Sequence, residues 1–464
     1  MSGARARGGV FFALIFGLAC LAASDAPRAD QAGKPAPPPS AAASSSSAPP
    51  PSAPVASDQA AQPEKKQTQG YRLPPEKYRQ AVAYARARDW LYFIRVAWGF
   101  LVLALILRWR LGARFRDWAE RAGRSRLVQA IVFAPLLLLT LDALELPAGM
   151  YSHWLARKYE QSIEPWGAWF QDWAKSEGLG ILLGTFLIWM LYGLIRRSPR
   201  RWWFYSWLAS LPIIVFLLFI SPVLIDPLFF RYEPLAARQP QLAAQIETMV
   251  QRAGMHIPPD HLFEMKASQK LKTLNAYVTG IGASKRVVVW DTTIARMTRP
   301  QILFVFGHEM GHYVLGHVPR GIAAFAMVLL VFLYAGFRLL RWMLARWRER
   351  WAIRAVDDWA SLPALLLLLS VFSFLATPVG NAFSRYLEHQ ADVYGLEVIH
   401  GVVPDAPEVS AQAFQILGEV DLEEPDPPAF IKFWLYSHPP LNERILLART
   451  YNPWANGQPP KFVQ

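Results

Sequence analysis

The segment Phe306-Gly-His-Glu-Met-Gly-His-Tyr-Val-Leu-Gly-His317 contains the pattern His308-Glu309-x-x-His312. Residues four positions apart lie on one face of an α-helix, so His308 and His312 can direct their imidazole nitrogens at one metal ion. The carboxylate of Glu309 lies beside that pair, where it can accept a proton from a water molecule that the metal activates. The pattern also arises by chance in buried helices, so a zinc hydrolase is a hypothesis that needs further residues.

The composition of the 464-residue chain is that of a membrane protein. Hydrophobic residues make up 53% of it and charged residues only 18%, and long apolar runs carry this excess. The net charge of +13 does not indicate a nucleic-acid partner, because the Lys and Arg residues cluster in short loops between the apolar runs. The single cysteine, Cys20, excludes an intramolecular disulfide framework and a zinc site built from several cysteines.

The N-terminal part of the chain has two sections. Residues 1–25 have a basic start, an apolar stretch over Val10–Leu21 and then small residues, which predicts a signal peptide or, if uncleaved, an N-terminal anchor. Residues 26–70 are rich in Pro, Ala and Ser. Such a segment buries too little apolar surface to offset its ordering entropy, so we expect a disordered linker.

Six apolar runs of spanning length follow, each with the roughly twenty residues that a bilayer requires. We expect membrane helices 1–4 within residues 88–225 and helices 5 and 6 within residues 321–383, which makes the fold mainly α. Arg95, Asp142 and Glu145 lie in or near the first two runs, where a charge faces either the bundle interior or the interface. The runs are Trp90–Leu107, Leu127–Tyr151, Leu179–Ile195, Trp203–Ile225, Ile322–Leu344 and Trp359–Phe383.

Arginine-rich loops indicate the orientation in the membrane. Seven arginines lie between the first two runs, four between the third and fourth, and five from the end of the fifth run (Arg341) to the start of the sixth, so these loops should be cytoplasmic. A cleaved signal peptide predicts the same arrangement. We therefore expect a multi-pass integral membrane protein, in the inner membrane if the cell is bacterial, with its active site on the non-cytoplasmic side.

Residues 226–320, between the fourth and fifth runs, have the pattern of a small α+β domain that contains the His308–His312 helix. Residues 384–464 are expected to complete its site. Pro300 suits the first turn of that helix. The predicted strands and helices of the domain are His261–Met265, Ala276–Val278 and Arg286–Trp290, and Leu242–Ala253, Thr292–Met297 and Pro300–Leu315.

A catalytic zinc ion needs three protein ligands and one open position, so the two histidines require a partner. If Ser384–Asp392 is helical, Glu388 and Asp392 share a face, and one carboxylate could bind the metal while the other orients a ligating histidine. A solvated helix after a membrane span would have the same composition. The residues alone leave both interpretations open.

Several segments, in order along the chain, resemble the integral-membrane zinc metallopeptidases that include the type I CAAX prenyl proteases and the HtpX-type bacterial proteases. The similarity runs from about Arg88 to Tyr451 and is closer to the prenyl-protease branch. The segments are Asn275–Thr293, His308–His312, Ser384–Asp392 and Ser437–Ile445, with Asp226–Pro234 and Glu164–Gly167 matching the prenyl-protease branch in particular.

The resemblance implies a multi-pass helical bundle with the small α+β zinc-metallopeptidase domain inserted between spans. It implies one zinc ion per chain, held by His308, His312 and Glu388, with Glu309 as the general base. Asp392 matches the acidic residue that supports catalysis one helical turn after the glutamate ligand.

Three further residues match positions that line the site in that family. His438 could stabilise the developing oxyanion, Arg444 would contact substrate, and Asn275 begins an edge segment that holds the substrate backbone by strand addition. His317 follows His312 by five residues, which turns it away around a continuous helix. We expect it to have a structural role or to support a ligand.

The predicted function is that of a membrane-embedded zinc endopeptidase acting on membrane-associated, lipidated or unfolded peptides. Its expected partners are a peptide or protein substrate and the lipid bilayer, with no nucleic acid; the sequence does not indicate an oligomeric state. Six spans and a site on the far side depart from the prenyl proteases, which puts CAAX substrates in question. The alternatives are an inactive scaffold or chaperone of the same fold, a transporter or channel, and a peptidase of soluble peptides.

Overall fold

The computed structural model describes residues 70–280 and 282–463, and the predicted signal segment and nearly all of the linker lie outside them. Six helices in the described part are long and apolar enough to cross a bilayer. This confirms the expected bundle of membrane helices. The six are α2 (Pro75–Arg108), α4 (Arg126–Lys158), α5 (Trp166–Arg197), α6 (Trp202–Ile220, extended by further turns to Leu228), α11 (His317–Trp351) and α12 (Leu362–Ile399).

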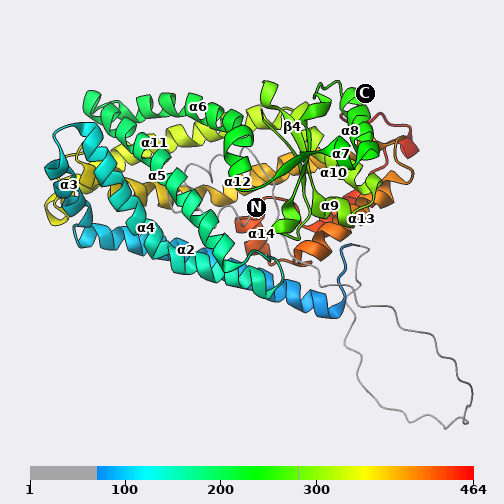
Figure 1. Cartoon of the computed structure of the whole chain (residues 1–464), viewed down its shortest axis with the longest axis horizontal. Helices are drawn as coiled ribbons and strands as arrows, with labels where there is room; N and C mark the ends of the chain where they lie inside the picture. The colour runs from blue at the N-terminus through cyan, green and yellow to red at the C-terminus, as the bar shows by residue number, and fades with distance from the viewer. Residues whose placement is uncertain (1–69, 281, 464) are drawn as a thin grey trace, which may run out of the picture.

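Two of these helices extend well beyond their apolar runs. Helix α2 begins at Pro75, before the run that starts at Trp90, and α12 continues past Phe383 to Ile399. Both ends project out of the bundle toward the remaining domain (Figure 1). Because α12 is a single 38-residue helix, it connects the membrane bundle rigidly to residues around Glu388.

The small domain is built on a four-stranded sheet with strand order β1-β2-β4-β3. Strand β2 is parallel to β4, while the other two neighbouring pairs are antiparallel. All five residues of β4 are buried, which marks the centre of the domain. The strands are β1 (Tyr232–Pro234), β2 (Leu262–Met265), β3 (Ala276–Thr279) and β4 (Arg286–Trp290).

The helices of this domain lie around the sheet and include the carboxyl-terminal part of the chain. The predicted strands and helices agree with the structure to within two residues at each end, but β1 was not predicted, because a three-residue edge strand ending in proline gives no alternating pattern. The helices are α7 (Leu235–Arg238), α8 (Pro240–Arg252), α9 (Asp291–Arg296), α10 (Arg299–Val314), α13 (Ala406–Asp421), α14 (Ala429–Leu435) and α15 (Leu441–Thr450).

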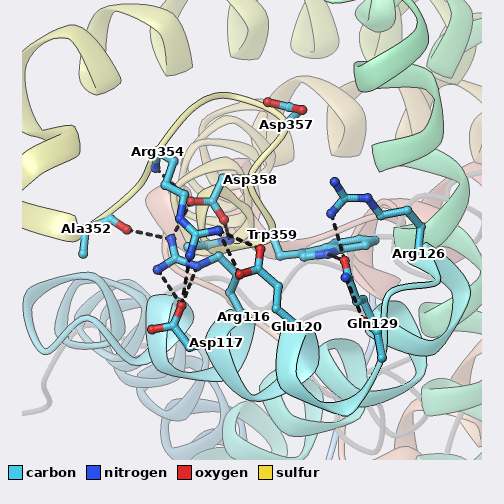
Figure 2. Close-up of polar contacts among 12 residues, drawn as sticks. Arg116, Asp117, Glu120, Arg126, Gln129, Ala352, Arg354, Asp357, Asp358 and Trp359 are labelled. Carbon is cyan, nitrogen blue, oxygen red and sulfur yellow. Dashed lines mark hydrogen bonds and ion pairs between the residues drawn. The ribbon is translucent and has the colours of Figure 1, made fainter.

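The arginine-rich loops gather at the end of the bundle that is far from the sheet. Helix α3 (Leu111–Ala122), the α5–α6 turn and the α11–α12 connection lie together there (Figure 1). Figure 2 shows how α3 is joined to the α11–α12 connection: Arg116 pairs with Asp358 at 2.6 Å, and Arg354 pairs with Glu120 at 2.7 Å. We call this arginine–carboxylate network the loop network.

Two ion pairs join the sheet domain to the membrane helices. Lys270 pairs with Asp172 of α5 and also donates to the backbone carbonyl of Phe229 at 2.7 Å. Arg286 of β4 pairs with Asp226 at 3.0 Å. These contacts hold the sheet against the ends of α5 and α6 and so fix its position relative to the bundle.

Candidate active site

The site lies where α10 and α12 cross, and small residues allow the crossing to be close. A side-chain carbon on Gly395 of α12 would lie 3.0 Å from the backbone nitrogen of His308. One on Gly307 would lie 2.8 Å from Val398, and one on Gly311 would lie 3.1 Å from Tyr394. The α10 and α12 backbones therefore approach each other at glycines on both sides, which brings the histidines of α10 against the carboxylates of α12.

Helix α10 presents its histidines as the spacing predicts. Thr298 and Gln301 form a capping box at its start, with a proline in the first turn, so the helix begins at a defined residue. The Nε2 atoms of His308 and His312 lie 3.3 Å apart. Both face Glu388, whose carboxylate oxygens lie 3.2 Å from His308 Nε2 and 3.5 Å from His312 Nε2.

These three residues could hold one metal ion. One ligand atom from each of His308, His312 and Glu388 lies within 4.8 Å of the others. Two imidazoles and one carboxylate are a donor set that suits catalytic zinc, which keeps a further position open. Burial lowers the pKa of His308, but hydrogen bonds to Asp392 and Glu388 more than offset burial and raise it to about 10. The carboxylates thus favour positive charge at this point, and the residues fit a cation.

Asp392 supports the cluster from one helical turn beyond Glu388. Its Oδ1 lies 2.8 Å from Nδ1 of His308, on the side of the ring opposite the proposed ligand atom. Such a contact fixes the tautomer and the orientation of a ligating histidine. Arg444 of α15 grips the same carboxylate with two hydrogen bonds of 2.9 and 2.6 Å, and its guanidinium lies over the ring of Phe414.

The structure brings His438 and Glu309 to the same cluster. The Nε2 atom of His438 lies 3.3 Å from a carboxylate oxygen of Glu388, and a quarter of its side chain is exposed. The carboxylate of Glu309 lies 4.0 Å from His308 Nε2. Both line a cavity of about 930 Å³ that extends from the site into the bundle.

His317 lies beside the cluster, although for a different reason from the predicted one. The α10 helix ends at Val314, and Gly316 adopts a left-handed φ of 68° before His317 begins α11. The chain therefore turns back, and Nδ1 of His317 lies 3.1 Å from Nδ1 of His312. His317 thus contacts His312 at the ring nitrogen that faces away from Glu388, and its role in supporting a ligand stays a prediction. The continuous helix assumed from the sequence is wrong.

Asn275 and Arg444 have been given substrate contacts, and both line the cavity. Asn275 directly precedes the edge strand β3, and its backbone is tied to Thr293 by hydrogen bonds of 2.6 and 2.8 Å. The guanidinium of Arg444 is engaged by Asp392. The geometry therefore gives Arg444 a structural task that sequence reasoning missed, while its contact with substrate stays a prediction.

The cavity is lined by both charged and apolar side chains. The charged ones include groups of the site and the ion pair between Arg95 of α2 and Glu145 of α4, at 3.3 Å. The apolar ones include Phe100, Phe325 and Phe374 from three membrane helices. Of the two placements considered for Arg95 and Glu145, the interior one is therefore correct. A ligand in the cavity would contact both polar and apolar surfaces.

Two residues of α12 near the site were not predicted. Asn381 and Arg385 donate hydrogen bonds to backbone carbonyls of α14 and of the residue after it. With Glu388 and Asp392 they recur at intervals of four, three and four residues, so all four lie on one face of α12. That spacing is visible in the sequence and is the signal that could have found them.

Comparisons with known proteins agree with this architecture. Residues 236–451 match the model of peptidase family M48, and residues 57–231 match the model of the CAAX prenyl protease N-terminal region, described as five membrane helices. The uncharacterized metalloprotease YhfN of Bacillus subtilis is 36% identical over 373 residues, which are 80% of this chain and 85% of that protein.

More distant relatives are similar to this chain over a comparable part of its length. The human CAAX prenyl protease 1 homolog is 25% identical over 389 residues, covering 74% of this chain and 78% of that protein. The crystal structure of S. mikatae Ste24p superposes with a TM-score of 0.68 at 20% identity and covers 81% of this chain and 89% of that one, which shows a common fold. By its sequence and its fold, this chain belongs to peptidase family M48 and is a multi-pass membrane metallopeptidase.

Proposed function

We propose that this protein is a zinc-dependent endopeptidase that cleaves membrane-associated, lipidated or unfolded peptides inside its cavity. The observation that carries the proposal is the meeting of His308, His312 and Glu388, with ligand atoms within 4.8 Å of one another and Asp392 bonded to the far nitrogen of His308. A bound zinc ion supplies Lewis acidity, which polarises a carbonyl group and lowers the pKa of a water molecule.

Glu309 is the proposed general base. Its carboxylate lines the cavity next to the ligand cluster, so it can accept a proton from the attacking water and then donate that proton to the nitrogen of the leaving amine. The Glu309 carboxylate is buried, which limits exchange of this proton with bulk water. Glu309 therefore serves both as base and as acid within one turnover.

His438 is the proposed oxyanion-stabilising group. Its Nε2 atom lies 3.3 Å from Glu388, and its side chain lines the cavity. An imidazolium or a neutral imidazole N–H at this point would donate a hydrogen bond to the negative oxygen that develops as water attacks the carbonyl. Since that charge develops only in the transition state, the interaction would raise kcat more than it lowers KM.

The substrate backbone is proposed to lie along β3. This strand is at an edge of the sheet, and Asn275 at its start lines the cavity, so an extended peptide could add as a further strand. The phenylalanines of the membrane helices that line the cavity, Phe100, Phe325 and Phe374, would accept an apolar side chain or a lipid group. The family relatives named as prenyl proteases make a lipidated peptide one substrate to test.

The orientation of the site is part of the proposal. The arginine-rich loops are at one end of the bundle and the ligand cluster is in the half that carries the sheet (Figure 1). If those loops face the cytoplasm, the site opens on the non-cytoplasmic side, which in a bacterium is outside the inner membrane. Peptides exposed on that side are then the accessible substrates.

Hydrolysis of two matched peptides would test the function. The purified protein, the same protein treated with a chelator, and the chelated protein restored with zinc would each be offered a farnesylated CAAX peptide and an unprenylated peptide of equal length. We expect cleavage at an internal bond by the native and restored proteins only. Cleavage that survives removal of the metal, or release of single terminal residues only, would contradict a zinc endopeptidase.

A further inference from the structure

The backbone that leads to His438 is held by hydrogen bonds from α12 in addition to the packing of α14. Helix α14 has seven residues, and none of its side chains is fully buried. The chain from Tyr436 to Pro440, which contains His438, has no helix or strand. Aromatic residues of α14 pack against Phe93 and Phe374, and Ser437 Oγ lies 3.0 Å from Nδ1 of His438. The irregular backbone of residues 436–440 still depends on side chains of other elements for its position.

Two side chains of α12 donate hydrogen bonds to backbone carbonyls at the end of α14 and directly after it. Arg385 Nη1 donates to the carbonyl of Lys432 at 3.2 Å and to that of Tyr436 at 2.5 Å. Asn381, which is 5% exposed, donates from Nδ2 to the carbonyl of Trp434 at 2.6 Å. The last carbonyls of a helix have no partner within the helix, so these bonds satisfy groups that would otherwise need water.

The same face of α12 continues to the ligand cluster. Arg385 precedes Glu388 by three residues, which is about one helical turn. One rigid helix therefore places both Glu388 and the backbone two residues before His438. On the other side of His438, Pro439 and Pro440 restrict the chain before α15 begins at Leu441.

We propose that Arg385, together with Asn381, is a positioning residue that fixes His438 beside Glu388 by holding the backbone carbonyls of Lys432, Trp434 and Tyr436. This inference rests on the proposed function, in which His438 stabilises the oxyanion. Arg385 itself touches neither the ligand atoms nor the reacting groups in this account. Its effect passes through the position of the His438 imidazole, whose Nε2 lies 3.3 Å from Glu388.

If the His438 imidazole is held less firmly, the rate of the chemical step should fall while substrate binding stays almost unchanged. Misplacement of a catalytic group by an ångström can cost about a hundredfold in rate. We therefore expect Arg385→Met to lower kcat by about tenfold to a hundredfold, with a similar KM and with normal zinc content. Arg385→Lys, which keeps a charged donor, should recover part of the loss. Asn381→Ala should cost less than Arg385→Met.

A double-mutant cycle separates positioning from a general structural role. Kinetics would be measured on Arg385→Met, His438→Ala and the double variant, using the peptide that the wild-type protein cleaves. If Arg385 acts through His438, Arg385→Met has no further effect on kcat once His438 is alanine. Arg338→Met is the matched control, because Arg338 donates to Tyr334 on its own helix, at 3.3 Å, and to no other residue that the structure describes. It should behave like the wild type.

Hydrogen exchange gives a readout that does not depend on activity. In Arg385→Met, backbone amides of residues 432–438 should exchange faster than in the wild type, while those of α10 should not change. Multiplicative kinetic effects in the double variant, loss of zinc from Arg385→Met, or unchanged exchange over residues 432–438 would each overturn the positioning role. If the wild-type protein binds zinc but cleaves no peptide, the proposed function fails, and the exchange result still decides the inference.

Discussion

The two ends of this molecule carry polar networks that differ in burial and in the groups that face their carboxylates. At the ligand cluster, Glu388 and Asp392 are 1% and 0% exposed, and they face the imidazoles of His308 and His312. In the loop network, arginines meet carboxylates directly, and the Arg354 side chain is 57% exposed (Figure 2). Imidazoles and carboxylates together form a donor set for a metal cation, whereas a guanidinium has no lone pair to offer one.

The difference shows which polar clusters carry chemistry. Burying a charge is costly unless it is paired, and the carboxylates on α12 have His308, His312 and Arg444 around them. The loop network resembles the site in having many hydrogen bonds, yet it holds loops together and leaves no ligand set open. The number of polar contacts therefore does not separate the two regions, while the kind of group that faces the buried carboxylates does.

The largest effect that this comparison predicts comes from removing the carboxylate ligand. Glu388→Ala should bring the zinc content from one ion per chain close to zero and should reduce peptidase activity by about a thousandfold or more, because two histidines alone do not complete a catalytic site. Elemental analysis and peptide hydrolysis would measure both. Glu349→Ala, an exposed glutamate near the loop network, should change neither. Full zinc occupancy in Glu388→Ala would show that Glu388 is not a zinc ligand.

A smaller effect is expected one turn further along α12. Asp392→Asn keeps the shape of the side chain but removes the charge that orients His308 and pairs with Arg444. Loss of such a supporting carboxylate typically weakens metal affinity by about 10- to 100-fold. Competition with a chromophoric chelator would give the dissociation constant. An affinity equal to that of the wild-type protein would show that Asp392 does not act on the metal through His308.

At the other end, the buried member of the loop network should matter for stability alone. Arg116 and Asp358 have side chains that are 6% and 3% exposed and lie 2.6 Å apart. Arg116→Ala leaves a carboxylate buried without this partner, and breaking such pairs costs about 3–5 kcal/mol. Thermal unfolding in one detergent should shift down, while kcat per zinc-loaded molecule stays constant. A fall in kcat without a change in stability would make the loop network part of the catalytic machinery.

The smallest effect should come from the exposed member of the same network. Arg354 contacts Glu120 and Asp117 at the surface, and exposed ion pairs contribute about 0–1 kcal/mol. Arg354→Ala should therefore shift the unfolding transition far less than Arg116→Ala does, and less again at high salt. A loss as large as that of Arg116→Ala would mean that burial does not distinguish the two arginines.

Local patterns predicted much of this fold. The apolar runs gave the six spans, and short-range spacing gave α10 with His308 and His312 on one face. Proline and apolar alternation located most of the sheet domain. These features depend on residues a few positions apart, which is the range over which helical and strand periodicity acts. Glu388 and His438 were assigned by family resemblance, since no local pattern relates them to α10.

The remaining features depend on contacts between distant segments. Gly395 permits the approach to His308, but its meaning appears only when α10 and α12 cross. Arg444 matched a position near the site. Its hydrogen bonds to Asp392 could not be predicted, because they depend on how the last fifty or so residues fold back onto α12. The turn at Gly316 returns His317 to the ligand His312, which helical periodicity could not foresee because the helix has ended.

The most direct test of the central claim compares the wild-type protein with Glu309→Gln, with zinc content and peptide hydrolysis measured on the same samples. The account predicts one zinc ion per chain in both proteins and hydrolysis by the wild type alone, because glutamine leaves the ligands in place but cannot accept the proton from water. Hydrolysis by Glu309→Gln at the wild-type rate, or a wild-type protein that binds no zinc, would contradict it.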